Sequence, residues 1–390
     1  SGLTTLCAIS YKILGMNTNI LTPDFVSHKW LPISSARLEE DGFVTVEWSD
    51  GLSFNAYSLW LAENADGYGL EPLSRESMLE PRILPKPEDL TECSVGRNGE
   101  LKIKWYDGRE NTIHPGWLRY VAEGKLTSNA SLPVFKPWGS TDLTEPPNIC
   151  YSELNDAKFK ELLSLLIAYG MVRLSETPVC KDFVESFASR IGCIRSSNFG
   201  YVFSVESKPL PDSSANTMLS LGQHTDLPSR ETPPGFQFLH CIINDSSGGE
   251  SLLSDGLSLV EALRTEQPRA YESLTTDEWV FMNRAVNDDH RWTGPSIELP
   301  SSNRPLTIRA FYPVRSSPHM PMDRIATAYE ALKIFYDYTR DPRFTIRYRL
   351  NSGDLIVFDN RRILHGRDEI INDGERLLVG CYMDQDEVYS

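Results

Sequence analysis

The 390-residue chain contains no long uninterrupted apolar segment, although hydrophobic residues make up 40% of its composition. A membrane-spanning helix needs about 20 consecutive, mostly apolar residues, so the sequence predicts no transmembrane helix and no membrane partner. The first residues also lack the positive charge followed by an apolar run that is typical of a secretory signal. We therefore expect a cytoplasmic protein.

Basic residues are scarce relative to acidic ones. The sequence has 38 lysine and arginine residues against 54 aspartate and glutamate residues, which gives a formal net charge of −16 at pH 7. Proteins that bind nucleic acids need a basic surface to contact the phosphates. The charge balance therefore argues against DNA and RNA as partners and is typical of an acidic cytosolic protein.

Paired cysteines are missing as well. The seven cysteines are scattered along the chain, and no two of them are spaced as Cys-x-x-Cys. An odd and dispersed set of this kind is typical of reduced thiols in the cytosol and not of a disulfide framework. A small secreted fold held together by disulfides is therefore not expected.

The first 130 residues contain an internal repeat. Trp48-Ser-Asp-Gly51 is followed by Trp60, nine residues after the glycine, and Trp105-Tyr-Asp-Gly108 is followed by Trp117 at the same spacing. In each copy an alternating apolar and polar stretch precedes an Asp-Gly turn, which is the pattern of a β-hairpin. We expect a small β-rich N-terminal domain over residues 1–130, with the tryptophans in its core.

A second domain is expected over residues 131–390, and four prolines between residues 133 and 147 mark its beginning. Apolar spacing predicts a helix from Lys158 to Tyr169 that ends at Gly170, and another from Ile325 to Thr339. The rest of this region is rich in short strands and turns. Composition and periodicity therefore favour a mainly β domain with flanking helices.

Two histidines and one aspartate form the strongest functional signal in the sequence. His224 and Asp226 are two positions apart, so they would lie on the same side of an extended strand, and His365 follows 139 positions after Asp226. Two imidazoles and one carboxylate on one face of a metal leave three coordination positions open, which is the arrangement of non-haem iron(II) sites. We expect these three residues to bind iron(II) and to form the catalytic centre.

An arginine begins an apolar stretch after His365, and the pattern of this stretch predicts a buried strand. Arg376 comes eleven residues after His365 and opens the apolar run that ends at Tyr382. An arginine fork can bind a carboxylate through two parallel hydrogen bonds, so Arg376 is expected to hold a 2-oxo acid that is bound to the metal. Alternation along the strand places Tyr382 on the same face. The alternative roles are an ion pair between strands for Arg376 and core packing for Tyr382.

With these residues the chain resembles the iron(II)- and 2-oxoglutarate-dependent dioxygenases, and within them the gamma-butyrobetaine and trimethyllysine hydroxylase branch. The resemblance is strong from Gly222 onward and weaker from about residue 40 to that point. The matching stretches are Gln223-His-Thr-Asp-Leu-Pro228, Pro233-Pro-Gly-Phe-Gln-Phe-Leu-His-Cys241, Gly248-Gly-Glu-Ser251, Ser254-Asp-Gly256, Gly353-Asp-Leu-Ile-Val-Phe-Asp-Asn360 and Trp138-Gly-Ser140.

The resemblance implies a double-stranded β-helix, or jelly roll, for the second domain, and an enzyme that uses iron(II), 2-oxoglutarate and O2. It also implies that Arg376 binds the distal carboxylate of 2-oxoglutarate, with support from Ser251 or from the backbone of Leu239. Animal butyrobetaine enzymes carry a cysteine-rich zinc site after an N-terminal Trp-Leu, whereas the corresponding stretch here, Trp60-Leu-Ala-Glu-Asn-Ala-Asp-Gly-Tyr68, has no cysteine. No structural zinc is expected.

Aromatic residues alternate in the stretch Phe199-Gly-Tyr201-Val-Phe203. In the family, aromatic residues of this region and a tyrosine that matches Tyr382 surround a trimethylammonium group, which is attracted to the faces of the rings. Phe199, Tyr201, Phe203 and Tyr382 are therefore the cage candidates. The ordinary alternative is that an aromatic stripe fills a core, and Asn216 stands where the butyrobetaine enzymes have a further cage tyrosine.

The anionic end of the substrate is assigned to the polar segment Asn287-Asp-Asp-His-Arg-Trp292, with Asn287 and Arg291 as the candidate contacts. The butyrobetaine enzymes hold a carboxylate with asparagines that this chain does not retain, whereas arginine forks favour a phosphonate. Arg291 could instead pair with one of the many acidic residues.

We therefore expect a homodimeric enzyme that hydroxylates a small quaternary ammonium compound, with 2-(trimethylamino)ethylphosphonate first and gamma-butyrobetaine or trimethyllysine as alternatives. Two other classes remain. A non-catalytic ligand sensor would not need the complete set of metal ligands together with Arg376. A protein-modifying oxygenase would not need an aromatic cage for a small molecule.

Overall fold

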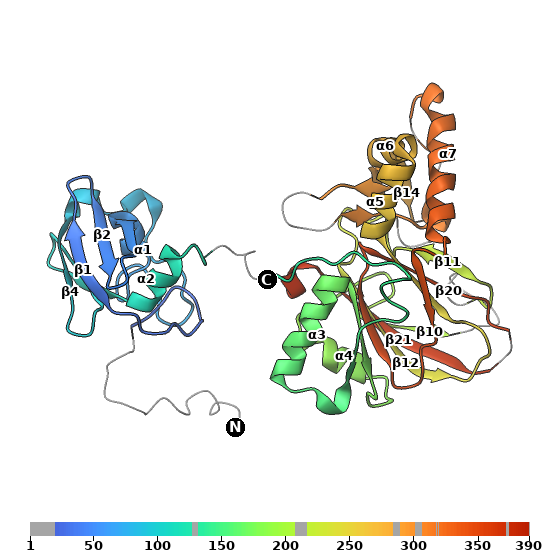
Figure 1. The fold of residues 1–390 in the computed structure, drawn as a ribbon, viewed down its shortest axis with the longest axis horizontal. Helices are drawn as coiled ribbons and strands as arrows, with labels where there is room; N and C mark the ends of the chain where they lie inside the picture. Colours follow the sequence, from blue (N-terminus) through green and yellow to red (C-terminus); the bar gives the residue numbers. More distant parts are fainter. Residues whose placement is uncertain are drawn as a thin grey trace. The chain divides into compact units, whose positions relative to one another are not determined.

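The computed structural model describes residues 20–126, 132–206, 217–283, 289–300, 306–316, 318, 320–371 and 374–389. The chain divides into two compact units, and the division falls between residues 130 and 131. Each unit has a hydrophobic core of its own, because the buried apolar residues of the first unit form a cluster that contains no residue of the second. The two units are coloured blue to cyan and green to red in Figure 1.

The first unit contains two antiparallel three-stranded sheets, with the strand orders β1-β2-β3 and β4-β5-β6. Two helices, α1 (Ser58–Glu63) and α2 (Pro115–Ala122), each follow the last strand of one sheet. The remaining elements are β1 (Ile33–Leu38), β2 (Phe43–Trp48), β3 (Ser53–Tyr57), β4 (Leu90–Val95), β5 (Leu101–Trp105), β6 (Glu110–Ile113) and the short 3-10 helices η1 (Pro81–Ile83) and η2 (Pro87–Asp89).

The two copies of the Trp-x-Asp-Gly repeat have the same local structure. Each tryptophan ends a strand, and each glycine lies in the turn to the next strand with a positive φ, 86° at Gly51 and 87° at Gly108. A side chain would strain the backbone there, which explains the glycine. Trp48, Trp105 and Trp117 are buried in the core of this unit.

The second unit is built on two sheets, which are mainly antiparallel. The larger sheet has the order β10-β21-β12-β19-β8-β7 with β9 beside β21, and the smaller has the order β11-β20-β13-β18. The larger contains β7 (Asn148–Cys150), β8 (Met171–Ser175), β9 (Ile194–Arg195), β10 (Val202–Glu206), β12 (Phe236–Asn244), β19 (Leu355–Asp359) and β21 (Arg376–Met383). The smaller contains β11 (Leu221–His224), β13 (Ser251–Asp255), β18 (Thr345–Tyr348) and β20 (Ile363–Arg367).

The two sheets pack against each other through apolar side chains. Leu253 and Ile346 of the smaller sheet belong to the same buried cluster as Ile356 and Leu378 of the larger sheet. The opposite face of the larger sheet is covered by α3 (Asp156–Tyr169) and α4 (Phe183–Ala188), whose apolar residues pack on β8, β12 and β19. The second unit is therefore mainly β with helices on its outside.

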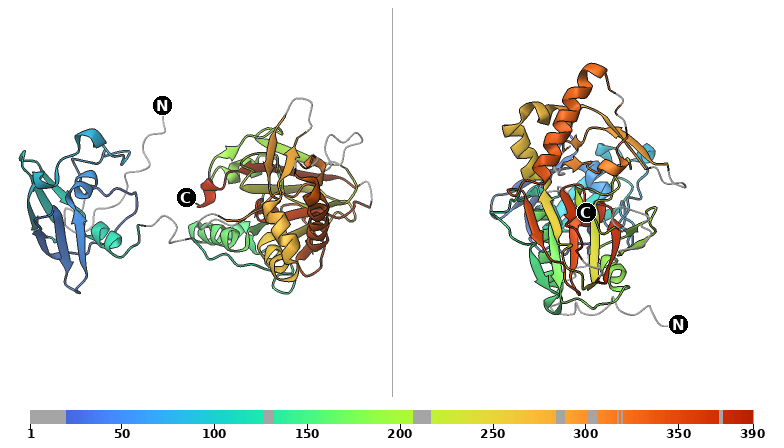
Figure 2. Two further views of the ribbon diagram at one scale, coloured as in Figure 1. Left: turned by 90° about the horizontal axis from the view of Figure 1, so that it is seen from above. Right: turned by 90° about the vertical axis from the view of Figure 1, so that its right-hand side faces the viewer.

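Between β13 and β18 the chain leaves the sheets and forms a helical layer. The helices α5 (Gly256–Glu266), α6 (Pro268–Thr276) and α7 (Met322–Thr339) share one hydrophobic cluster and lie side by side in both views of Figure 2. The short strands in this layer are β14 (Trp279–Met282), β15 (Arg291–Gly294), β16 (Ile297–Glu298) and β17 (Thr307–Ile308). The 3-10 helices η3 (Tyr151–Glu153) and η5 (Tyr312–Val314) and the helix α8 (Asp386–Tyr389) complete the unit.

Both predicted helices are present and begin a few residues earlier than expected. Helix α3 begins at Asp156, where the Asn155 side chain accepts a hydrogen bond from the Lys158 backbone, and it ends at Gly170 with a φ of 74°. Helix α7 begins at Met322, directly after Pro321. None of the described helices is long and apolar enough to cross a membrane.

Candidate metal centre and its pocket

Three side chains from the smaller sheet and the loop beside it converge on one point. His224 is the last residue of β11, and it lies directly opposite His365 of β20 in the antiparallel register. Asp226 follows two residues later, with its Oδ1 atom 3.3 Å from Nε2 of His224 and 3.7 Å from Nε2 of His365. One donor atom from each residue lies within 4.8 Å of the others, and no second group of this kind occurs in the described residues.

The orientation of His224 is set by its neighbours. Its Nδ1 atom lies 2.9 Å from the backbone oxygen of Gly222, and because a carbonyl only accepts, Nδ1 carries the proton and Nε2 keeps its lone pair. The ring of Phe311 stacks on His224 at 4.7 Å, and that of Phe358 packs on His365 at 4.7 Å. The Nε2 atoms of both histidines therefore lie toward Asp226, and an aromatic ring packs on each imidazole.

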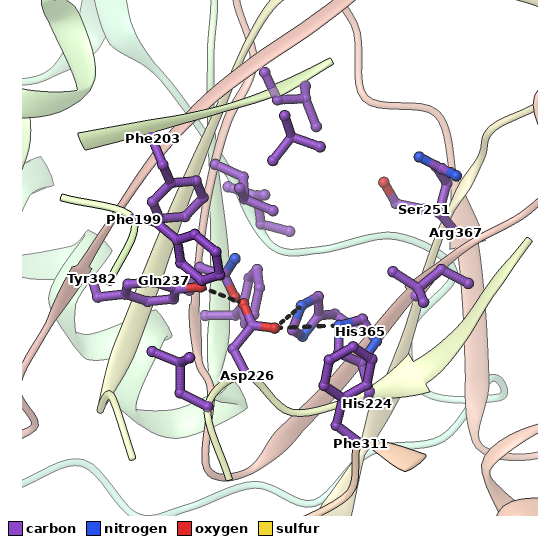
Figure 3. Close-up of a pocket in the computed structure, with 18 of the residues that line it drawn as sticks. Phe199, Phe203, His224, Asp226, Gln237, Ser251, Phe311, His365, Arg367 and Tyr382 are labelled. Atoms are coloured by element: carbon purple, nitrogen blue, oxygen red, sulfur yellow. Dashed lines mark hydrogen bonds and ion pairs between the residues drawn. The ribbon is translucent and has the colours of Figure 1, made fainter. Parts of the chain in front are cut away.

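Asp226 is held at both its backbone and its carboxylate. The Asn360 side chain accepts a hydrogen bond from the Asp226 backbone N–H at 2.7 Å and donates one to its carbonyl at 3.0 Å. The Tyr382 hydroxyl donates to Oδ2 of Asp226 at 2.7 Å. Figure 3 shows the contact with Tyr382, with Phe199, Phe203 and Tyr382 on one side of Asp226 and the two histidines on the other.

The protonation states suit a divalent cation. Burial alone would raise the pKa of Asp226, but the imidazoles of His365 and His224 hold it below its ordinary value. Burial and the neighbouring His224 lower the pKa of His365 to about 3. Two imidazoles and one carboxylate are the donor set of the facial iron(II) triad, and the residues present therefore fit the implied metal.

A cavity of about 620 Å³ opens beside the three residues. Its lining joins both sheets and the helical layer, so that residues far apart in the sequence share one wall. The polar or aromatic members are Asn198, Phe199, Phe203, Ser204, His224, Asp226, Ser229, Gln237, Ser251, Asn283, Phe311, Tyr348, Phe358, His365, Arg367, Arg376 and Tyr382.

Arg376 is a buried cation in this cavity. It is only 7% exposed, and its guanidinium has no hydrogen bond or ion pair with any of the described residues. Burial and the nearby Arg367 lower the pKa of Arg376 to about 10. A buried charge without a counter-ion is costly, so the geometry indicates an anionic ligand at this end of the cavity and disfavours an ion pair between strands.

Ser251 and Leu239 line the same cavity as Arg376. Ser251 begins β13, opposite Arg367 of β20 and Tyr348 of β18. Leu239 lies in the middle of β12, which pairs with β19 on one side and β21 on the other.

Three of the four cage candidates line the cavity. The rings of Phe203 and Tyr382 have their centres 4.9 Å apart, and those of Phe199 and Phe203 lie 6.1 Å apart. Tyr201 is 63% exposed and does not line the cavity. The expected alternation along a strand fails here because β10 begins only at Val202, after a turn in which Gly200 has a φ of 91°.

The structure does not bring Arg291 into the cavity. Its guanidinium is largely exposed and forms a two-pronged ion pair with Asp289, with distances of 2.7 and 2.9 Å. The ordinary alternative, pairing with an acidic neighbour, therefore describes Arg291. Asn287, Asn216 and the rest of 284–288 lie outside the described residues.

Several lining residues were not predicted. Gln237 is two positions before Leu239, so alternation along β12 could have identified it. Its Oε1 atom is buried without a hydrogen-bond partner. Phe311, Ser229 and Asn283 come from the helical layer and from the loop after Asp226, and no local pattern in the sequence indicates that these segments approach the metal ligands.

Comparisons with known proteins agree with this geometry. The family model "Taurine catabolism dioxygenase TauD, TfdA family" matches residues 135–382. A gamma-butyrobetaine dioxygenase from Pseudomonas sp. (strain AK-1) is 37% identical over 367 residues, which cover 92% of this chain and 95% of that protein. The gamma-butyrobetaine dioxygenase of Homo sapiens is 30% identical over 308 residues, which cover 75% of this chain and 78% of that protein.

A solved structure supports the fold of the second unit. The crystal structure of AAD-2 in complex with Mn(II) and N-oxalylglycine aligns with a TM-score of 0.50 at 15% identity, and the alignment covers 62% of this chain and 96% of that chain. At this identity the likeness concerns the fold alone.

Proposed function

The chain belongs to the TauD/TfdA family of dioxygenases, and from this premise we propose that it hydroxylates an unactivated C–H bond in a small trimethylammonium compound with an anionic tail. It is a 2-oxoglutarate-dependent dioxygenase that uses iron(II) and O2. We also infer that the second unit is a double-stranded β-helix, that residues 1–130 and 131–390 are separate domains, and that the enzyme is a cytoplasmic homodimer.

We assign the metal and co-substrate to named residues. His224, Asp226 and His365 hold the iron(II) ion, and Arg376 binds the distal carboxylate of 2-oxoglutarate with Ser251 beside it. Bound iron(II) supplies the activation of oxygen that cleavage of an unactivated C–H bond requires. The protein contributes the position of the substrate relative to the metal, because reaction depends on holding the reacting atoms within contact distance.

The observation that carries the substrate assignment is the position of the aromatic rings. Phe203 and Tyr382 pack together at 4.9 Å, and the hydroxyl of Tyr382 contacts the ligand Asp226. A trimethylammonium group at these rings would therefore lie close to the metal, and each ring face would attract it by about 0.5–2 kcal/mol. The two relatives named above are both gamma-butyrobetaine dioxygenases.

The chemistry of the tail has two candidates. We place 2-(trimethylamino)ethylphosphonate first, because the chain lacks the zinc cysteines, one cage tyrosine and the carboxylate-binding asparagines of the butyrobetaine enzymes. Gamma-butyrobetaine is second, and the 37% identity to the Pseudomonas enzyme favours it. Arg291 no longer supports the phosphonate, because its charge is already paired with Asp289.

The test is a comparison of substrates. The protein is supplied with iron(II), 2-oxoglutarate and O2, and both succinate and hydroxylated product are measured with the phosphonate, with gamma-butyrobetaine and with the primary-amine analogue of each. We expect turnover of the trimethylated compounds and at least tenfold less of the primary amines. Equal turnover of both series would reject the aromatic cage, and preference for the carboxylate would identify a gamma-butyrobetaine hydroxylase.

A further inference from the structure

Tyr382 contacts the head-group site and the metal centre at once. Its ring packs against Phe203, with 4.9 Å between the ring centres, while its hydroxyl donates a hydrogen bond of 2.7 Å to Oδ2 of Asp226. The side chain is 3% exposed. One residue of β21 therefore joins the wall proposed for the ammonium group to a metal ligand.

The hydrogen bond distinguishes the two oxygen atoms of the carboxylate. Oδ1 faces the imidazoles, 3.3 Å from His224 and 3.7 Å from His365, whereas Oδ2 accepts the hydrogen bond from Tyr382. Asn360 fixes the backbone of Asp226 from a third direction. With both ends held, the carboxylate cannot rotate to present two oxygen atoms to a cation without breaking the Tyr382 contact.

We propose that Tyr382 is a positioning residue that makes Asp226 a one-oxygen ligand through Oδ1 and leaves the remaining metal positions open. The second part of the inference rests on the proposed function: a trimethylammonium group against the Tyr382 ring polarises the phenol, so that occupancy of the head-group site changes the hydrogen bond to the metal ligand. Binding of the substrate head group thereby changes the environment of the metal through the Tyr382 side chain.

The direction of the hydrogen bond supports this role. The carboxylate of Asp226 is ionised and only accepts. The Tyr382 hydroxyl is therefore the donor in the 2.7 Å contact with Oδ2. Contacts of this kind around metal ligands orient them, and their removal typically weakens metal binding by about 10- to 100-fold.

The test uses cobalt(II) as a spectroscopic probe, without substrate or 2-oxoglutarate. Tyr382→Phe keeps the ring and removes the hydroxyl. We expect its dissociation constant for cobalt(II) to rise by about 10-fold or more, with a change in the visible absorption bands of the bound ion. The KM for the trimethylammonium substrate should change by less than about threefold, because the ring faces remain.

Tyr389→Phe is the matched control. The Tyr389 hydroxyl also donates to an aspartate, Asp359, at 3.3 Å, but Tyr389 does not line the cavity. Its cobalt(II) affinity and spectrum should match those of the parent protein. Parent-like cobalt(II) binding in Tyr382→Phe would overturn the positioning role, whatever the substrate proves to be.

A measurement on the parent protein covers the case in which Tyr382→Phe does not fold. Tetramethylammonium carries the head group without a tail, and we expect its addition to shift the cobalt(II) bands of the parent protein. Binding of tetramethylammonium without any shift would overturn the coupling. Absence of tetramethylammonium binding would reject the proposed substrate class and overturn the coupling with it; where Tyr382→Phe folds, its cobalt(II) affinity decides the positioning role separately.

Discussion

At the scale of single residues, the pocket differs from an ordinary core because several buried polar atoms in it have no hydrogen-bond partner among the residues that the structure describes. Arg376 carries a buried charge, and the Oε1 atom of Gln237 and the Nδ1 atom of His365 are buried without hydrogen bonds. Such groups cost free energy unless a ligand satisfies them. These unpaired groups therefore lower the stability of the folded protein, and they indicate that a ligand binds in the pocket.

The metal ligands provide the first prediction. His224→Ala, Asp226→Ala and His365→Ala should each reduce 2-oxoglutarate turnover to background, because two remaining ligands do not hold iron(II) in a defined geometry. Bound iron and succinate release are measured together, with circular dichroism to establish folding. His28→Ala, in the first unit, is the control and should keep parental activity. Full activity in any triad variant would reject the assignment.

Arg376 provides the second prediction. Arg376→Leu should raise the 2-oxoglutarate concentration required for half-maximal turnover by roughly 30-fold or more, since stranding a buried carboxylate costs about 2–5 kcal/mol. The same substitution removes an unpaired buried cation, so the unfolding free energy should stay equal or increase. A destabilised variant with unchanged 2-oxoglutarate affinity would show that Arg376 is structural.

At this scale the sequence singled out residues that the structure brings close together, while one proposed substrate contact lies away from the cavity. His224, Asp226 and His365 lie together, and Arg376 lines the same cavity. Asp226 lies in the loop after β11 and not on the strand, and only the resemblance indicated that segments so far apart in the sequence would meet. Arg291 was chosen for its charge, and a neighbour two residues away satisfies that charge instead. The sequence alone does not show whether an arginine forms an ion pair with a neighbouring acidic residue or is available to bind a ligand.

At the scale of elements, the loop after Asp226 is held in an unusual conformation. Leu227 has a φ of 53°, in the left-handed region that a leucine rarely adopts. The guanidinium of Arg309 donates to the carbonyl groups of Pro228 and Glu231 at 2.7 and 2.8 Å and pairs with Glu298 at 2.6 Å. Arg309 thus compensates for the strain next to a metal ligand.

Replacement of Arg309 is the third prediction. Arg309→Met should lower the unfolding free energy by about 3–5 kcal/mol, because Glu298 and several carbonyl groups lose their buried partner. Denaturant unfolding followed by circular dichroism measures it. Arg291→Met, the same change at an exposed ion pair, should keep the parental midpoint. Similar midpoints for the two variants would show that Arg309 does not hold the loop.

The helices were predicted better than the strands at this scale. Apolar spacing and Gly170 placed α3 to within two residues of its start and at its end. Aromatic residues alternate with other residues from Phe199 to Phe203, but the stretch does not form one continuous strand. Gly200 lies in a turn, and β10 begins only after it, at Val202. Alternation over five residues cannot distinguish a strand from a turn that contains glycine.

At the scale of the whole molecule, buried histidines couple stability to pH. His240 lies in the centre of the larger sheet, and burial lowers its pKa to about 4, below the usual 6.5. As the pH falls below 6.5, the unfolded chain takes up a proton at this position and the folded chain does not. The stability present above pH 6.5 is therefore lost as the pH decreases.

The fourth prediction follows for the metal-free protein. Between pH 6.5 and pH 5, the unfolding free energy of the parent should fall by about 2 kcal/mol more than that of His240→Gln, at about 1.4 kcal/mol per pH unit. Denaturant unfolding at several pH values measures it. Parallel pH profiles for the two proteins would contradict the assignment.

The mainly β character of the second unit was predicted from periodicity, but the pairing of its strands was not. β12 pairs with β19 and β21, which lie more than 100 residues away in the sequence, and no local pattern encodes such partners. The jelly roll was expected only through the resemblance. The spacing of apolar residues also did not predict that the helical layer would bring Phe311 to the cavity.

The central claim is that turnover of 2-oxoglutarate is coupled to hydroxylation of a trimethylammonium compound. The most direct measurement uses isotopically labelled O2 and follows succinate and the hydroxylated product by mass spectrometry. We expect one labelled oxygen atom in each, in equal amounts, with the trimethylammonium phosphonate or carboxylate. Succinate release that is unaffected by every trimethylammonium compound, or a product without label, would contradict the claim.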